Sequence, residues 1–317
     1  TAPLLPGYAG SSPGTLANAT LEEGEPGHGG GVTGSTWFKW RPRVTAPVSV
    51  DTRGSAGDTV LDVYTGSEVT ALTRLGGNDD ALDLAPQSRV TFNAVAGTTY
   101  RIAVSEWQEL GRSVRNRPIR ARTVGYGPRK VLWVGGIHGN EPEGSIATAS
   151  LPADFLAAGL AESVTLTIIE DINPDGRAAN TRGNANKVDL NRNYPARTFV
   201  PGPENGPKPL SEPEARVLHD WVLAHKPDLV VVCHAWGGRH FINYDGPAAE
   251  LAKLFAELSG YPLVVSNSFN PTPGSLGQWV GADLGRPILT LEWLKGKNWQ
   301  EAWEETRAAA LAVIAGR

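Results

Sequence analysis

The run KVLWVGGIHGNE (130–141) decides the fold of this chain. Its first half is a continuous apolar stretch, which is typical of a strand buried on both faces of a sheet. Three later runs show the same pattern: VTLTIIEDI (164–172), DLVVVCH (228–234) and PILTLEW (287–293). Helical patterns lie between them. We therefore predict an α/β fold, in which a mostly parallel or mixed central sheet carries helices on both faces.

Three helices of this part are the clearest. The segment SEPEARVLHDWVLAH (211–225) opens with Ser211 and carries Glu214 three residues later, which is the spacing of a capping box. The segments GPAAELAKLFAELSG (246–260) and NWQEAWEETRAAALAVIAG (298–316) are amphipathic and end at a glycine. Strands that alternate with such helices indicate crossover connections.

The first 110 residues follow a different pattern. Short β-rich runs alternate there with Gly, Asn and Asp clusters such as RGSAGD and GGNDDA. The runs are STWFKW (35–40), VSVDT (48–52), TVLDVYTG (59–66), SRVTFNAV (88–95) and TYRIAVSEW (99–107). Close spacing without a helical period favours a small all-β sandwich. We predict two domains, a β-sandwich accessory domain at 1–110 and an α/β catalytic domain at 111–317.

Composition narrows the function classes. The net charge of -4 provides no reason to expect nucleic acid or an anionic membrane as a partner. No apolar run reaches the roughly 20 residues of a membrane span. The single Cys233 cannot form an internal disulfide. Methionine is absent even from position 1, which fits a removed signal peptide or a trimmed chain, and we expect a secreted bacterial protein.

Reactive side chains stand at the ends of the predicted strands. His138 and Glu141 follow the first strand, His234 ends the third, and Glu292 interrupts the apolar fourth. Open α/β sheets place their sites at the carboxyl ends of strands, so these side chains converge. Two imidazoles and a carboxylate form a zinc ligand set with a position left for water. A further carboxylate, Glu292, takes the proton from that water.

Other interpretations apply to single residues. Four histidines, namely His28, His219, His225 and His240, are interpreted as structural or solvated. Glu141 has the alternative role of capping a helix, whereas Glu292 in an apolar strand is costly without a partner. Cys233 neighbours His234 in a strand, so its side chain faces the opposite side as a small buried hydrophobe. The sequence contains no nucleophile elbow, phosphate-binding loop or dinucleotide motif.

At this point several motifs in the same order resemble one family. They are GGIHGNE (135–141), NPDGRAANTRGNANKVDLNRNYP (173–195), CHAWGG (233–238), NYDGPAAELA (243–252), TPGSLGQWVG (272–281) and LTLEW (289–293). Together they resemble the zinc carboxypeptidases of the carboxypeptidase A superfamily, and the most similar branch is the bacterial murein peptide amidases. The resemblance covers about residues 110–317.

The resemblance implies a role for each matching residue. One zinc ion is held by the two histidines and the glutamate named above, and Glu292 activates the water and later protonates the leaving amine. Arg182 polarises the cleaved carbonyl, and Asp189 orients a ligand histidine, His138. Asn191 and Arg192 bind the terminal carboxylate of the substrate, which suits the fork of an arginine.

One segment departs from the family pattern. The family has a tyrosine shortly before the TPGSLG-like stretch, whereas this chain has Phe269 and Asn270 there. A phenylalanine shields a site but donates no hydrogen bond. Ser275, Leu276 and Gln278 are expected near the pocket for the residue after the cut bond, and they indicate a pocket without charge.

The first domain resembles the bacterial pre-peptidase C-terminal domain, although that domain usually follows a peptidase. Its aspartates are a candidate calcium site, because calcium prefers oxygen ligands; ordinary turn aspartates are the simpler interpretation. The residues concerned are Asp51, Asp58, Asp62, Asp79 and Asp80.

The sequence thus predicts a zinc metallopeptidase that cuts a peptide or amide bond next to a free carboxylate. Its substrate is either a C-terminal residue of a peptide or the γ-D-glutamyl-diaminopimelate bond of a cell-wall muropeptide. Two alternatives stay open: a zinc-dependent acylamino-acid deacylase, and a non-catalytic protein that binds cell-wall peptide. The oligomeric state is not readable from the sequence.

Overall fold

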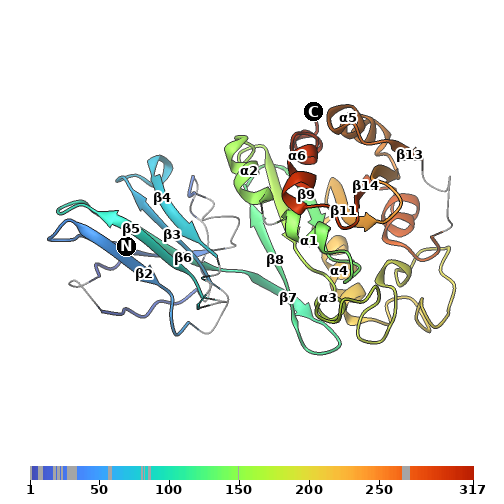
Figure 1. The fold of residues 1–317 in the computed structure, drawn as a ribbon, viewed down its shortest axis with the longest axis horizontal. Helices are drawn as coiled ribbons and strands as arrows, with labels where there is room; N and C mark the ends of the chain where they lie inside the picture. The colour runs from blue at the N-terminus through green and yellow to red at the C-terminus, as the bar shows by residue number, and fades with distance from the viewer. Residues whose placement is uncertain are drawn as a thin grey trace. The chain divides into compact units, whose positions relative to one another are not determined.

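The computed structural model describes most of the chain. The described residues are 2–5, 10–16, 19, 22, 24–26, 34–55, 59–79, 81, 83–84, 87–148, 150–265 and 272–317. The chain divides into two compact units, Thr1–Gln108 and Glu109–Arg317 (Figure 1). None of the helices in the described ranges combines the length and the hydropathy of a bilayer-spanning helix.

The N-terminal unit is built from two antiparallel sheets. One has the order β1-β6-β3-β4 and the other pairs β2 with β5. The strands are β1 (Ser35–Trp40), β2 (Ala46–Asp51), β3 (Thr59–Thr65), β4 (Thr73–Asn78), β5 (Arg89–Ala94) and β6 (Tyr100–Glu106). Side chains of both sheets, among them Phe38, Leu61 and Val90, share one hydrophobic cluster. The five predicted strands are all present.

Strand β4 was missed from the sequence, because its Gly-Gly pair was interpreted as a turn. The structure explains these glycines. Asp62 on β3 is fully buried and forms an ion pair with Arg74, whose Nε lies 2.6 Å from Asp62 Oδ1. Gly77 lies opposite Asp62 in the register, and a Cβ there would stand 1.9 Å from Asp62 Oδ1. The missing side chain therefore makes room for the ion pair.

The candidate calcium ligands serve other partners where they are described. Asp62 pairs with Arg74, Asp51 lies 3.6 Å from the Nε of Arg89, and Asp79 accepts a hydrogen bond from Trp107 Nε1 at 3.1 Å. Asp58 and Asp80 lie outside the described residues. These contacts favour the interpretation as structural aspartates.

The C-terminal unit contains one mixed eight-stranded sheet, with the order β13-β12-β14-β11-β9-β10-β8-β7. Its strands are β7 (Gln108–Arg112), β8 (Pro118–Val124), β9 (Arg129–Val134), β10 (Val164–Ile169), β11 (Leu229–Trp236), β12 (Phe241–Asp245), β13 (Leu263–Val265) and β14 (Ile288–Leu294). The four neighbours β10, β9, β11 and β14 run parallel. They are the four strands that the sequence predicts.

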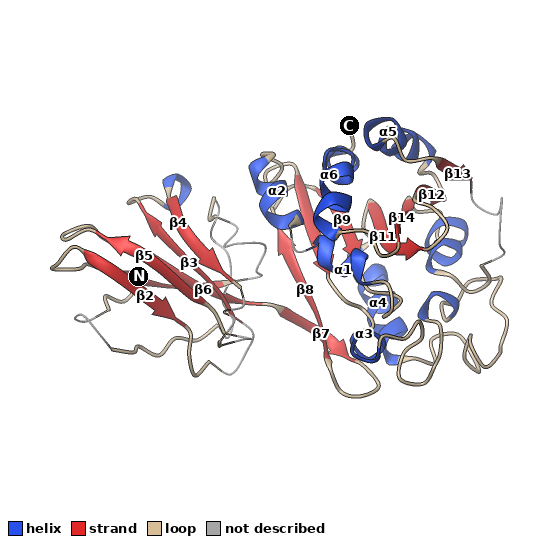
Figure 2. Ribbon diagram, in the orientation of Figure 1, coloured by secondary structure: helices blue, strands red, loops and turns tan. Residues whose placement is uncertain are grey.

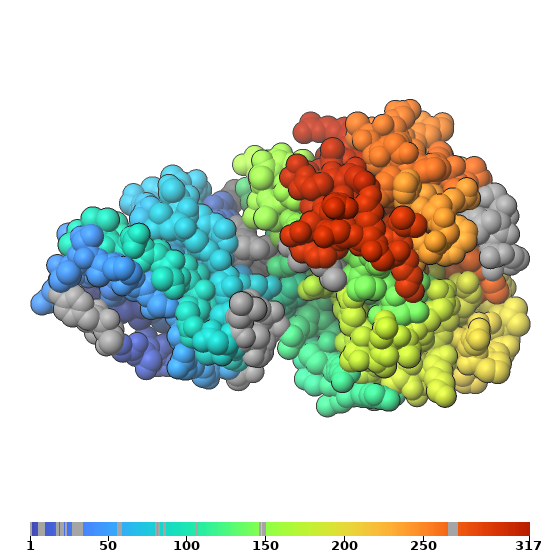
Figure 3. Space-filling view, viewed as in Figure 1, coloured from blue at the N-terminus to red at the C-terminus, as the bar shows by residue number. Residues whose placement is uncertain are grey.

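Helices cover both faces of this sheet, as predicted (Figure 2). They are α1 (Pro142–Thr148), α2 (Leu151–Ala157), α3 (Pro174–Ala179), α4 (Pro213–His225), α5 (Ala249–Ser259) and α6 (Trp299–Ala315). Val131 and Trp133 of β9 pack in the cluster that holds residues of α1, α2, α5 and α6. Leu132 and Val134 point the other way, into the cluster with α4. In the space-filling view α5 and α6 form a continuous orange-to-red surface (Figure 3).

The predicted capping box at α4 is wrong. The helix begins at Pro213, and Glu212 occupies the cap position without a side-chain capping bond. Ser211 Oγ donates instead to the Glu212 carboxylate at 2.8 Å. Glu214 is fully buried and accepts from Val114 N and Asn184 Nδ2. Both side chains of the predicted capping box therefore form other contacts than the capping hydrogen bonds.

Candidate active site and metal centre

The reactive residues converge where parallel strands end, as the sequence predicts. The chain leaves β9 through Gly135–Ile137 and reaches His138 directly. His234 lies in the last half of β11, and in the pairing with β14 it stands opposite Glu292. The loop of His138 packs so closely on α3 that a Cβ at Gly139 would lie 1.9 Å from the Gly176 carbonyl carbon. This approach holds the loop in place.

Three buried side chains form a compact ligand cluster. His138 Nδ1 and His234 Nδ1 lie 3.0 Å apart, and Glu141 Oε2 lies 3.0 Å from the first and 3.1 Å from the second. All three residues are at most 6% exposed. Two ring nitrogens and a carboxylate oxygen directed at one point fit zinc, whose catalytic sites use three such ligands and leave one position open. Within the described residues this is the group that can hold a metal.

Asp189 contacts the ligand cluster through His138, on the ring nitrogen that does not face the other ligands. Its Oδ1 lies 2.9 Å from His138 Nε2 and accepts from the backbone N–H of Asn191 at 2.9 Å, while Oδ2 accepts from Arg182 Nε at 2.9 Å. Burial raises the pKa of this carboxyl, but the hydrogen bond and charge of His138 and the charge of Arg182 outweigh it and lower the pKa below its usual range. One carboxylate thus positions three candidate site residues.

The Asp189 contact to His138 leads to a prediction on metal affinity. We expect Asp189→Asn to weaken zinc binding by about 10–100-fold, because the amide orients the imidazole less well and makes it less basic. Competition with a chromogenic chelator measures this affinity. Asp220→Asn, on an exposed aspartate beside His219, is the matched control. An unchanged zinc affinity in the Asp189 variant would contradict the positioning role.

Arg182 and Glu292 line the pocket that contains the ligand cluster. The Arg182 guanidinium is half-exposed and reaches Glu141 Oε1 through Nη1 at 3.2 Å. Glu292 is partly buried and lines the same pocket. Burial, together with the nearby negative charge of Glu141, raises the pKa of Glu292 to about 8. An arginine and a glutamate therefore share the pocket with the three ligand residues.

The candidate carboxylate-binding pair lies on a short helical turn, η2 (Leu190–Arg192). Asn191 Oδ1 accepts from the backbone N–H of Leu276 at 2.9 Å, and Arg192 Nη1 donates to the Asn191 carbonyl at 2.7 Å. Asn191 and Arg192 both line a pocket of about 230 Å³ that also contains the ligand cluster. The turn thereby presents an amide and a guanidinium to the same space.

The remaining predicted residues are only partly found in the pocket. Ser275 lines it as predicted. Leu276 does not, because its side chain is fully buried in the hydrophobic core, and it contacts the site through its backbone N–H. Phe269 and Asn270 lie outside the described residues, as does His28. Cys233 packs in the core on the face opposite His234, as predicted.

The pocket-lining residues that were missed in the sequence include Trp236, Asn243, Asp245, Thr290 and Thr272. Thr290 had a signal, because it stands two residues before Glu292 in the same strand and so shares its face. Asn243 and Asp245 belong to β12, which was not predicted as a strand. Asp245 also corrects the expectation of a pocket without charge.

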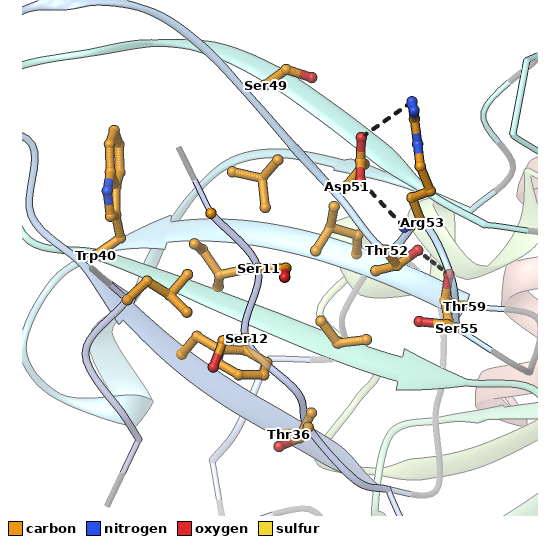
Figure 4. A pocket seen from close by; sticks show the side chains of 18 of the residues that line it. Ser11, Ser12, Thr36, Trp40, Ser49, Asp51, Thr52, Arg53, Ser55 and Thr59 are labelled. Carbon is orange, nitrogen blue, oxygen red and sulfur yellow. Dashed lines mark hydrogen bonds and ion pairs between the residues drawn. The ribbon is translucent and has the colours of Figure 1, made fainter. Parts of the chain in front are cut away.

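A larger cavity of about 450 Å³ lies in the N-terminal unit (Figure 4). Its lining includes the apolar side chains of Leu61 and Ile102. The charged residues of the lining, Asp51 and Arg53, are paired with each other. The candidate active site is therefore the smaller pocket, which contains the cluster of potential metal ligands.

Comparison with known proteins identifies the second unit. A family model described as zinc carboxypeptidase matches residues 100–308. The chain belongs to the zinc carboxypeptidase family. This membership confirms the predicted cofactor, one zinc ion, for which the His138–Glu141–His234 cluster is suited. The resemblance of the first domain to the pre-peptidase C-terminal domain stays a prediction.

Two relatives show the range of this family. Murein peptide amidase A of Escherichia coli K12 is 33% identical over 202 residues, which are 58% of this chain and 80% of the amidase. Carboxypeptidase SOL1 of Arabidopsis thaliana is 31% identical over 258 residues, which are 67% of this chain. This chain spans about half, 51%, of the length of that plant carboxypeptidase.

Solved structures agree with the fold. The murein-tripeptide amidase of E. coli O157 superposes with a TM-score of 0.56 at 27% identity, over 66% of this chain and 91% of that chain. A metallo-carboxypeptidase of Burkholderia cenocepacia covers 89% of both chains with a TM-score of 0.54 at 17% identity. The second likeness shows the fold alone. The predicted carboxypeptidase-like α/β fold is confirmed.

Proposed function

We propose that this protein is a zinc-dependent metallopeptidase of carboxypeptidase or murein peptide amidase type, which hydrolyses a peptide or amide bond next to a free carboxylate. The observation that supports it most is that one pocket collects the ligand cluster, Glu292, and the Asn191–Arg192 pair. Family membership supports the same reaction class.

Each residue of the site has a separate role in the proposed reaction. His138, Glu141 and His234 would hold the zinc ion, which would supply a Lewis acid and lower the pKa of a water molecule. Glu292 takes a proton from the attacking water and delivers it to the amine when the C–N bond breaks. Arg182 donates hydrogen bonds to the carbonyl oxygen as it gains negative charge.

The substrate is oriented by its terminal carboxylate. Arg192 and Asn191 both line the pocket with side chains that carry N–H donors, and contacts to Leu276 and Asp189 hold the asparagine in place. A planar arginine suits a carboxylate in two parallel hydrogen bonds. This pair accounts for a preference for bonds that lie one residue from a free C-terminus.

Blocking that carboxylate tests the proposal. We expect a C-terminally amidated peptide to be cleaved with a kcat/KM about 10–100-fold lower than the same peptide with a free C-terminus, because one charged hydrogen-bond acceptor is lost. Chromatography of the released residue measures both rates. Equal rates would contradict the role of Arg192 and Asn191.

Three substrate sets separate the candidate activities. Peptides with a free C-terminus test the carboxypeptidase, and peptides that contain a γ-D-glutamyl-diaminopimelate bond test the muropeptide amidase, which the E. coli relative favours. N-acylated single amino acids test the deacylase alternative. A binding protein would cleave none of them, with or without added zinc.

A further inference from the structure

The run NPDG (173–176) begins with a fully buried asparagine that has no role in the proposed reaction. Asn173 lies between β10 and α3 and occupies the cap position of that helix. Its Oδ1 accepts a hydrogen bond from the backbone N–H of Gly176 at 2.9 Å. This cap uses only the oxygen of the side-chain amide. The two N–H donors on Nδ2 are left for other partners.

These donors connect two segments of the active site. Asn173 Nδ2 lies 3.3 Å from the carbonyl oxygen of Ile137 and 3.3 Å from the carbonyl oxygen of Arg182. Ile137 directly precedes the ligand His138, and Arg182 is the candidate partner of the substrate carbonyl. One amide group therefore joins the main chain of the ligand loop to the main chain of the arginine, although the two segments are far apart in the sequence.

Both segments pack closely on the start of α3. The backbone N–H of Asn173 donates to the carbonyl oxygen of Gly136 at 3.1 Å, and that of Thr181 donates to the carbonyl oxygen of Gly176 at 2.9 Å. A Cβ at Gly176 would stand 2.5 Å from Asn173 Nδ2 and 2.6 Å from the carbonyl oxygen of Gly183. The missing side chain of Gly176 therefore lets the segment of Arg182 reach the amide of Asn173.

The position of the Arg182 guanidinium depends on this main-chain contact. The guanidinium is half-exposed, and it reaches Asp189 through Nε at 2.9 Å and Glu141 through Nη1 at 3.2 Å. These contacts hold the end of a long side chain, whereas Asn173 holds the main chain from which that side chain starts. A donor to a developing negative charge has to be placed within about 0.5 Å of its working position. Contacts at both ends of Arg182 meet this requirement.

We propose that Asn173 is a positioning residue, whose side-chain amide sets the place of Arg182 relative to the ligand His138. This inference rests on the proposed function, because it assumes that Arg182 stabilises the carbonyl oxygen of the substrate. Asn173 is not among the residues that line the pocket. It therefore acts through Arg182 and His138, without touching the substrate.

Replacement by aspartate separates positioning from helix capping. Asn173→Asp keeps the size of the side chain and the capping oxygen, because aspartate caps helices about as well as asparagine, but it removes both N–H donors. We expect kcat of the zinc-loaded protein, on the substrate that the wild type cleaves, to fall about 10-fold, because Arg182 loses its anchored main chain. KM should stay within about twofold. Steady-state kinetics measure both parameters.

The matched control is the same change at another helix cap. Asn298 caps α6, and its Oδ1 accepts from the backbone N–H groups of Gln300 and Glu301. Asn298→Asp should leave kcat and KM unchanged. A fall in kcat as large as that of Asn173→Asp would show a general effect of the cap substitution and would overturn the proposal.

A double-mutant cycle shows whether Asn173 acts through Arg182. Arg182→Ala removes the guanidinium, so adding Asn173→Asp in that background should lower kcat by less than about twofold further. An equal fall in both backgrounds, or no fall in the wild-type background, overturns the proposal. If Asn173→Asp does not fold, Asn173→Ser takes its place in the cycle, because serine also caps a helix but carries no amide.

Zinc affinity provides a readout that does not depend on turnover. Competition with a chromogenic chelator should show about 10-fold weaker zinc binding in Asn173→Asp, because the carbonyl next to the ligand His138 loses its donor. Asn298→Asp should bind zinc as the wild type does. Equal affinities of wild type and Asn173→Asp overturn the proposal and leave the proposed function in place. Weaker zinc binding by Asn173→Asp, together with a wild type that cleaves no substrate, overturns the proposed function and supports the positioning role.

Discussion

Replacing Glu292 by glutamine is expected to lower kcat by about 10²–10⁴-fold, the usual contribution of a positioned general base. Glutamine has nearly the same shape, but it cannot accept the proton of the attacking water. Glu292 lies opposite His234 in the sheet and belongs to no ligand contact of the cluster. We therefore expect the zinc content, measured by atomic absorption, to stay at that of the wild type.

The control for this variant is Glu250→Gln. Glu250 lies on the exposed side of α5, where it pairs with Lys253, so the same chemical change there should leave turnover unchanged. If Glu292→Gln kept normal turnover and still bound zinc, the proton-transfer role would be wrong. Loss of both turnover and zinc would instead indicate that Glu292 stabilises the metal cluster.

The second large effect concerns the metal ligands. We expect His234→Ala to lose bound zinc and to reduce peptide hydrolysis to the background rate, because two remaining side chains do not complete a zinc site. Dialysis of the wild type against a chelator should have the same effect on activity, and added zinc should restore it only in the wild type. Zinc content and hydrolysis rate are measured on the same samples.

A histidine outside the cluster serves as the control. His225 ends α4, stacks on Trp221 and bonds its carbonyl oxygen, so His225→Ala should keep both zinc and activity. Full activity in chelator-treated wild type would exclude zinc catalysis. Activity retained by His234→Ala, with bound zinc, would exclude that histidine as a ligand.

The site residues that follow or end buried strands could be predicted from the sequence. Strands β9, β11 and β14 are recognisable as apolar runs, and a His or Glu at the end of such a run stands out because it breaks the apolar pattern. The sequence alone predicts the ligand cluster and Glu292 in this way. Asp189, Arg182 and the Asn191–Arg192 turn lie in a polar loop without periodicity, so only resemblance to a family pointed to them.

Other residues were misread because their partners are distant in the chain. Gly77 was predicted as a turn residue, but it lies in a strand, where the absence of a side chain leaves room for the Asp62–Arg74 ion pair. Glu214 looked like half of a capping box but is buried against Asn184 and Val114. Leu276 was expected in the pocket, whereas its side chain belongs to the core. Local spacing does not contain these contacts.

The sequence by itself determined the fold class and the parallel centre of the sheet, and it predicted the four residues His138, Glu141, His234 and Glu292, which share one pocket. It could do so because burial on both faces of a strand leaves an unbroken apolar run, and a charged residue there stands out. Only the tertiary structure decided what surrounds them. The position of β12 beside β14 brings Asp245 into the pocket, and one Asp189 carboxylate joins a ligand, an arginine and a turn. These links depend on pairing between segments far apart in the chain, which local sequence patterns do not specify.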